Sequence, residues 1–234
     1  MPESLTHMWS LIEVERPLLS ADDLGQLGDD HQAAMESLGF LVPAATAAHI
    51  VCSECHDDHI VEVNRVRKGG KTRFFITCPD AGWCEVSGDR LRQWSIDCEA
   101  VAKALKDALA PSGRRKAILP GRLWRLGTTT WQQTSRDVVF ARGLSWPDAG
   151  DVTRAIAKTT RPIVLVPNQI PDDDCWVRGV PPVVALSQVS QLCDGKLEID
   201  QTHMMAAITE QDAAPTETGA GVISTKKQKL MIRQ

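Results

Sequence analysis

Residues 50–86 read IVCSECHDDHIVEVNRVRKGGKTRFFITCPDAGWCEV, and this stretch is the most informative part of the 234-residue chain. It carries two cysteine pairs, Cys52 with Cys55 and Cys78 with Cys84. Cysteines this close in sequence can face one ion from a tight turn, and structural zinc takes four such ligands in a closed tetrahedron. We therefore expect these four cysteines to hold one structural zinc ion.

The residues between the two pairs predict a β-hairpin. Residues 60–66 alternate apolar and polar side chains, residues 73–77 read as a returning strand, and the KGGK sequence at 68–71 is a hairpin turn signal. A cysteine pair in a tight turn, called a knuckle, therefore lies on each side of a two-stranded hairpin. This order resembles the zinc-ribbon family over residues 50–86. The resemblance implies a metal-stabilised module. It implies no single function, because zinc ribbons occur in nucleic-acid binders, in accessory domains of enzymes and as structural staples.

Other potential ligands and thiols lie near the four cysteines and elsewhere in the chain. Either His56 or His59 could replace a cysteine, but with four cysteines present we expect both to lie in the outer shell or in solvent. The remaining cysteines, Cys98, Cys175 and Cys193, are far apart, and we expect each to act as a small buried apolar side chain.

The composition excludes a membrane span and indicates the compartment. No run of 18 apolar residues is present, so we expect no transmembrane helix and no membrane partner. The N-terminus lacks the basic start and apolar stretch of a signal peptide. We therefore expect a cytoplasmic protein.

The fold class predicted for the whole chain is α+β or α/β, with N-terminal helices, a zinc ribbon and a C-terminal α/β domain. Residues 1–49 form the helical segment, in which Ser20 and Asp23 predict a capping box. Residues 50–96 contain the ribbon. Asp97 is expected to cap a helix that opens the domain of residues 97–210.

The α/β domain is predicted from apolar runs separated by a helical segment. Residues 137–141 and 163–166 read as strands, and together with the helix between them they predict a βαβ unit over 137–166 in a mixed sheet. Residues 211–223 are a linker by composition, followed by a basic tail that ends at Gln234. We hypothesise that the natural chain continues beyond it.

Charge locates the predicted binding surface on the ribbon hairpin. The net charge of −4 excludes a global basic field. A local cluster near Phe74, Phe75 and Trp83 could grip phosphates and stack on bases. Its cations are Arg65, Arg67, Lys68, Lys71 and Arg73, and the tail adds Lys226, Lys227, Lys229 and Arg233.

We therefore expect a zinc-binding, nucleic-acid-associated regulatory or accessory protein without catalytic activity of its own. One alternative is a subunit of a larger complex, in which the zinc is purely structural and the α/β domain docks on a protein partner. A second alternative is a nuclease or nucleotide-dependent enzyme with carboxylates at strand ends. That alternative requires Asp137, Asp172 and Glu198 to cluster.

Overall fold

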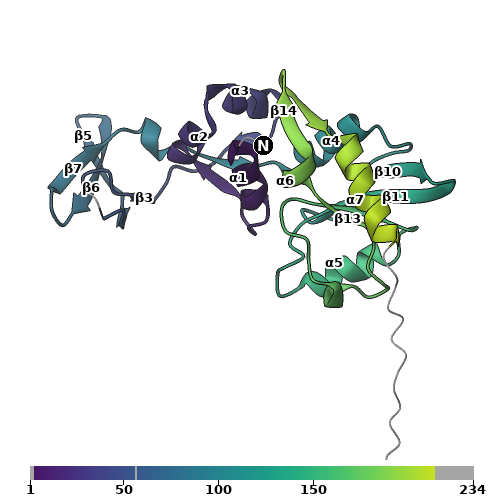
Figure 1. The fold of residues 1–234 in the computed structure, drawn as a ribbon. Coiled ribbons are helices and arrows are strands. Elements are labelled where there is room, and N and C mark those ends of the chain that lie inside the picture. The colour runs from purple at the N-terminus through teal and green to yellow at the C-terminus, as the bar shows by residue number, and fades with distance from the viewer. Residues whose placement is uncertain (1–2, 56, 214–234) are drawn as a thin grey trace, which may run out of the picture.

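The computed structural model describes residues 3–55 and 57–213, and within them the chain mixes helices with several sheets (Figure 1). The fold class therefore agrees with the sequence. The helices are α1 (Glu3–Ile12), α2 (Ala21–Leu27), α3 (Asp29–Ser37), α4 (Cys98–Leu109), α5 (Ala149–Ile156), α6 (Leu186–Val189) and α7 (Gln201–Ala213).

A five-stranded mixed sheet forms the centre of the body. Its strands lie in the order β13-β12-β11-β10-β9. The pairs β9–β10 and β10–β11 are antiparallel, whereas β11–β12 and β12–β13 are parallel, which confirms the predicted βαβ unit. The bounds are β9 (Lys116–Leu119), β10 (Leu123–Trp131), β11 (Thr134–Ala141), β12 (Ile163–Val166) and β13 (Val183–Ala185).

Capping explains where several helices begin. The Ser20 hydroxyl accepts the N–H of Asp23 and the Asp23 carboxylate accepts the N–H of Ser20, so the predicted capping box at α2 is present. Asp97 accepts the N–H of Glu99 and thereby caps α4 as expected. Gly28, with φ of 82°, separates α2 from α3.

The N-terminal segment also contains short strands that the sequence did not predict. A three-stranded antiparallel sheet has the order β1-β8-β2, so residues before and after the ribbon meet in one sheet. Segments of three or four residues are too short to reveal an alternating pattern. The strands are β1 (Leu18–Ser20), β2 (Leu41–Pro43) and β8 (Gln93–Ile96).

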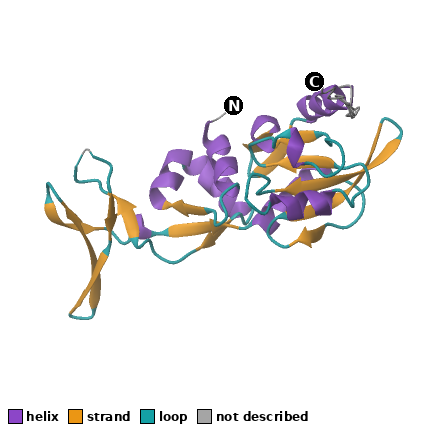
Figure 2. Cartoon of the chain, turned by 90° about the horizontal axis from the view of Figure 1, so that it is seen from below, coloured by secondary structure: helices purple, strands orange, loops and turns teal. Residues whose placement is uncertain are grey.

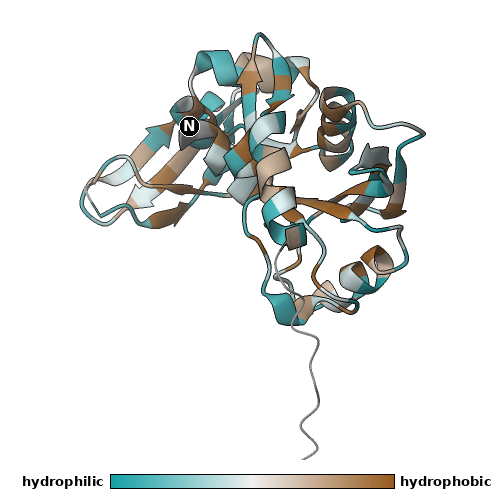
Figure 3. Ribbon diagram, turned by 45° about the vertical axis from the view of Figure 1, so that its right-hand side comes forward, coloured by the Kyte–Doolittle hydropathy of each residue, from teal (hydrophilic) through white to brown (hydrophobic). Residues whose placement is uncertain are grey.

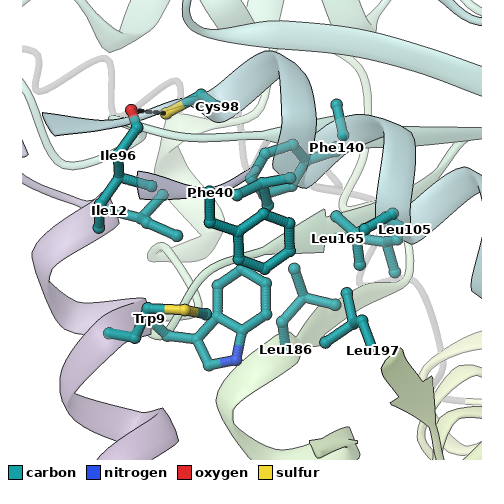
Figure 4. Packing of buried hydrophobic residues seen from close by; sticks show 14 of the residues in the cluster. Trp9, Ile12, Phe40, Ile96, Cys98, Leu105, Phe140, Leu165, Leu186 and Leu197 are labelled. Carbon is teal, nitrogen blue, oxygen red and sulfur yellow. Dashed lines mark hydrogen bonds between the residues drawn. The ribbon is translucent and has the colours of Figure 1, made fainter. Parts of the chain in front are cut away.

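One hydrophobic core joins the N-terminal segment to one face of the central sheet. Trp9, Phe40 and Phe140 are fully buried and lie close together in Figure 4. The indole Nε1 of Trp9 donates to Oγ of Ser190 at 2.8 Å, which satisfies the polar atom of this buried ring. The other face of the sheet packs on α5 in a second cluster that includes Val152.

The hydropathy of the strands follows from this two-sided cover. All four residues of β12 are buried, and the strands in the middle of the body are brown in Figure 3. A strand between two apolar layers has no solvated face, so it needs no polar alternation. None of the described helices is long and apolar enough to cross a membrane.

The ribbon segment extends away from the body and has its own small core (Figures 1 and 2). The antiparallel pair β3–β4 lies beside a three-stranded sheet of order β5-β6-β7. Gly69 and Gly70 form the two-residue turn between β5 and β6 with φ of 60° and 79°, as the sequence predicts. The strands are β3 (His49–Val51), β4 (Ile60–Glu62), β5 (Asn64–Lys68), β6 (Lys71–Cys78) and β7 (Gly82–Val86). A separate hairpin, β14 (Ser190–Cys193) with β15 (Lys196–Ile199), precedes α7.

Candidate metal centre

Four side chains of the ribbon segment converge on one point. The ligand atoms of Cys52, Cys55, His59 and Cys78 all lie within 4.8 Å of one another. Three sulfurs and one imidazole nitrogen form a donor set suited to a closed tetrahedral zinc site. With Zn–S bonds of about 2.3 Å, tetrahedral ligands lie about 3.8 Å apart, so a small inward adjustment would seat an ion.

The β3–β4 hairpin positions the first three of these residues. Cys52 directly follows β3 and His59 directly precedes β4, and the N–H of Cys52 donates to the carbonyl of His59 at 2.9 Å. Cys55 lies in the loop between them, where its Sγ is 3.2 Å from Nδ1 of His59. The hairpin therefore places His59 next to Cys52, although the two residues are seven positions apart in sequence.

Main-chain N–H groups surround the three clustered sulfurs. Sγ of Cys52 accepts the N–H of Glu54 at 3.4 Å, and Sγ of Cys78 accepts the N–H of Ala81 at 3.4 Å. The N–H of Asp57 likewise reaches the sulfur of Cys55. Such N–H donors stabilise thiolates and orient them toward a metal. The loops are therefore arranged for metal-bound sulfur.

The pKa values of these thiols show how closely the sulfurs are packed. The N–H groups of Ala81 and Asp80 hold the pKa of Cys78 below its ordinary value. For Cys55, the N–H of Asp57 lowers the pKa, but burial and the nearby sulfurs outweigh it and raise that pKa to about 11. Crowded sulfurs resist joint ionisation unless a cation lies among them.

Cys84, the fourth ligand expected from the sequence, lies outside this group. It is half-buried in β7, where it pairs with Ile76, and Cys78 pairs with Gly82. Its Sγ faces the carbonyl oxygens of Ala81 and Gly82, at 3.8 and 3.7 Å. Burial raises the pKa of the Cys84 thiol, and the charges of Glu54 and Cys78 raise it further. The position of its Sγ, and not this pKa, separates Cys84 from the group of four donor atoms.

The fourth ligand position therefore has two candidates, and the structure favours His59. The ring is half-buried, and its Nε2 is a buried atom with no hydrogen-bond partner in the described residues. The sequence reasoning placed both histidines in the outer shell or in solvent, so the position of His59 within the group differs from that expectation. His56 lies outside the described residues.

Arg90 connects the loop that carries Cys52 and Cys55 to the N-terminal helix α2. Its guanidinium donates to Oγ of Ser53 at 2.6 Å and to the carbonyl of Val51 at 2.8 Å. It also pairs with the carboxylate of Asp22 on α2 at 3.2 Å. Sequence reasoning missed this residue, because a single arginine between two modules carries no pattern.

The three cysteines outside the ribbon occupy different environments. Cys98 is buried as expected, although its Sγ accepts a hydrogen bond from the buried Arg142 at 3.2 Å. Cys175 is half-buried and Cys193 is exposed, so the expectation of burial is wrong for Cys193. Cys193 immediately precedes the turn between β14 and β15, where a side chain has little to pack against.

The predicted basic residues divide between the two faces of the β5-β6-β7 sheet. Side chains of directly paired residues point to the same face. The pairs Lys68–Lys71, Val66–Arg73 and Asn64–Phe75 therefore share one face, here called the outer face, which also carries Trp83 and Glu85. Arg65 and Arg67 lie on the opposite face, where Arg65 lies 5.9 Å from the ring centroid of Phe74.

The outer face carries a stacked aromatic pair with one exposed ring. Phe75 stacks on Trp83 with ring centroids 5.3 Å apart and an interplanar angle of 21°, and Trp83 is 57% exposed. The guanidinium of Arg73 lies 5.4 Å from the centroid of Phe75 and forms an ion pair with Glu85. Lys68 and Lys71 are exposed and make no ion pair with a described residue.

The three carboxylates of the nuclease alternative do not come together. Among the described residues, the cysteine and histidine group is the one cluster of potential metal ligands. Asp137 is buried in the central strand β11, where it pairs with Arg125 at 2.7 Å and accepts the N–H of Thr160. That alternative therefore lacks the arrangement it requires. The basic tail residues 226, 227, 229 and 233 lie outside the described residues.

Comparisons with known proteins identify no relative of this chain. No family model, no curated protein and no solved structure matches it. The geometry of the ribbon segment is therefore the basis for a functional assignment.

Proposed function

We propose that the protein binds one structural zinc ion and uses the metal-stabilised ribbon to bind nucleic acid as a regulatory or accessory protein. The zinc part rests on the donor set, because thiolates with one imidazole suit zinc and leave no open coordination position for chemistry. The core of the ribbon is small, and modules of this size commonly need a metal to fold.

The Phe75–Trp83 pair, whose Trp83 ring is exposed on the same sheet face as two lysines, is the observation that supports nucleic-acid binding. An aromatic pair on an open sheet face leaves apolar surface in contact with water, which does not stabilise the fold. Such exposed apolar surface commonly marks a binding site. Bases can stack on such a platform, and each stacked base contributes about 1–3 kcal/mol. The outer face carries Lys68, Lys71 and Arg73 against one carboxylate, so it attracts a phosphate backbone.

A binding assay with matched variants tests this proposal. Fluorescence anisotropy with labelled single-stranded and double-stranded oligonucleotides would be measured over a range of salt concentrations. Trp83→Ala should weaken binding to single strands about tenfold, from the loss of one stacked base. Replacing Lys68 and Lys71 by alanine should weaken binding to all sequences and reduce the slope of log K against log salt by about 2.

Two controls make the outcome interpretable. The double variant Lys103→Ala and Lys196→Ala removes two exposed lysines from the body, so it should leave binding unchanged. Zinc content measured in each variant shows whether the ribbon is still folded. Undiminished binding by the Trp83 and lysine variants would reject the outer face. Tight binding of a protein partner without any nucleic-acid affinity would favour the alternative of an interaction subunit.

A further inference from the structure

A second feature of the molecule lies far from the ribbon, beneath α5 and the end of α7. It is a cavity of about 350 Å³, a size within the usual range for small-molecule sites. Its walls are formed by the start of β11, the C-terminal half of α5, the loop of residues 176–182 and Asp212 of α7. It does not contribute to the proposed nucleic-acid surface.

The charge of the cavity is strongly positive. Arg136, Arg161 and Arg178 line it, and Asp212 is the one carboxylate among its lining residues. Asp212 pairs with Arg136 at 2.7 Å. Arg161 and Arg178 form no ion pair with a described residue, so their charges remain uncompensated. This surplus of two positive charges matches the charge of a phosphate monoester near neutral pH, about −1.5 to −2.

Two of the lining residues also carry buried N–H groups without a partner. Nε of Arg136 and Nε1 of Trp176 are buried atoms without a hydrogen-bond partner in the described part of the chain, and both residues line the cavity. A buried N–H without a partner costs about 1–3 kcal/mol, so native proteins rarely leave two in one place. These two N–H groups lie behind the surface of the cavity, and the exposed Arg161 and Arg178 are the groups that a bound ligand reaches directly.

The remaining walls are apolar and suit an organic group. Ile156, Pro162, Val177 and Val180 line the cavity together with the ring of Trp176. A site that bound only inorganic phosphate would not need such walls, whereas a ligand with a flat or apolar body would bury surface against them. Guanidinium groups bind phosphate oxygens in pairs, which fixes the orientation of the ligand.

We propose that this cavity binds a small phosphate monoester, with the phosphate held by Arg161 and Arg178 and the organic part packed against Trp176 and Ile156. The 5′-mononucleotides represent the size class. The proposal is independent of the metal centre and of nucleic-acid binding by the ribbon.

The test uses the full chain and a defined panel of probes. Isothermal titration calorimetry would compare 5′-mononucleotides and ribose 5-phosphate with inorganic phosphate and adenosine. At least one ester should bind more tightly than phosphate or adenosine does. Arg161→Ala and Arg178→Ala should each weaken it at least tenfold. In proton–nitrogen correlation spectra, the indole N–H of Trp176 should shift on titration.

The control is an arginine close to the cavity but outside its lining. Arg154 is exposed on α5 and pairs with Asp151, so Arg154→Ala should leave the affinity unchanged. Both tested arginines are exposed, so their removal should not unfold the protein. No ester binding below 10 mM, or binding that Arg178→Ala leaves intact, would overturn the proposal.

Discussion

The identity of the fourth metal ligand gives the sharpest prediction. His59→Ala should remove one of the four clustered donors, whereas Cys84→Ser changes a side chain outside the cluster. Structural zinc contributes about 10–16 kcal/mol in small modules, and an equal share for each of four ligands is about 3 kcal/mol. We therefore expect His59→Ala to raise the Kd for zinc about 100-fold and Cys84→Ser to change it less than about threefold.

The assay is a competition between the protein and a chromophoric chelator for zinc, with Cys78→Ser as the positive control. Cobalt substitution gives an independent readout, because the sulfur-to-cobalt absorbance increases with the number of bound thiolates. Cys78→Ser should reduce this band by about a third if three thiolates bind, and Cys84→Ser should leave it unchanged.

The reverse pattern would refute the reasoning. If Cys84→Ser loses about 100-fold in affinity and a quarter of the cobalt band while His59→Ala is neutral, the four cysteines expected from the sequence form the site. A rotation of the Cys84 side chain away from the carbonyls of Ala81 and Gly82 would then accompany metal binding. If none of these variants changes zinc affinity, the segment has no metal site.

Three further predictions concern the body of the protein. Gly127→Ala should destabilise the protein by about 1–3 kcal/mol, because the added Cβ would lie 2.5 Å from the main-chain oxygen of Ser112. Gly25→Ala should instead stabilise α2 by about 0.5–1 kcal/mol, because its Cβ would meet no neighbouring atom within 4 Å. Thermal unfolding of the two variants measures both effects. Arg142→Ala should lower the free energy of unfolding in urea by about 3 kcal/mol, because the buried guanidinium donates to Cys98 Sγ and to the main-chain carbonyls of residues 14 and 15. Arg142→Lys should not restore this stability, because an ammonium group lacks the planar set of donors of a guanidinium. Burial raises the pKa of Glu13 despite the N–H of Gly143, so the folded state holds this proton more tightly and stability falls as pH rises through that pKa. Glu13→Gln should therefore stabilise at pH 7, and a gain that persists below about pH 4 would contradict this origin.

Local spacing explains which parts of the ribbon were predictable. Gly69 and Gly70 identified the turn because few other residues adopt positive φ at both positions. The spacing of Cys52 and Cys55 identified a knuckle because two residues are enough to form that turn. These features depend on neighbours in sequence, so the sequence reveals them.

The position of His59 could not be predicted in the same way. It depends on the pairing of β3 with β4, and β3 spans only His49–Val51, too short to show an alternating pattern. The place of Cys84 depends on the register between β6 and β7, which sets Gly82 opposite Cys78 and Ile76 opposite Cys84, so Cys84 shares a face with Cys78 but lies two residue pairs away along the sheet. A shift of register by one residue would reverse the side of each side chain.

The sequence by itself determined the fold class, the place of the Cys52–Cys55 knuckle, the hairpin turn and the βαβ unit, because short-range spacing and apolar periodicity encode them. The tertiary structure decided which four donors meet, and that Lys68 and Lys71 share a face with the Phe75–Trp83 pair. It also brought Arg136, Arg161 and Arg178 around one cavity. Such groupings join residues that are distant in the chain, and only the packing of strands and helices fixes which of them become neighbours.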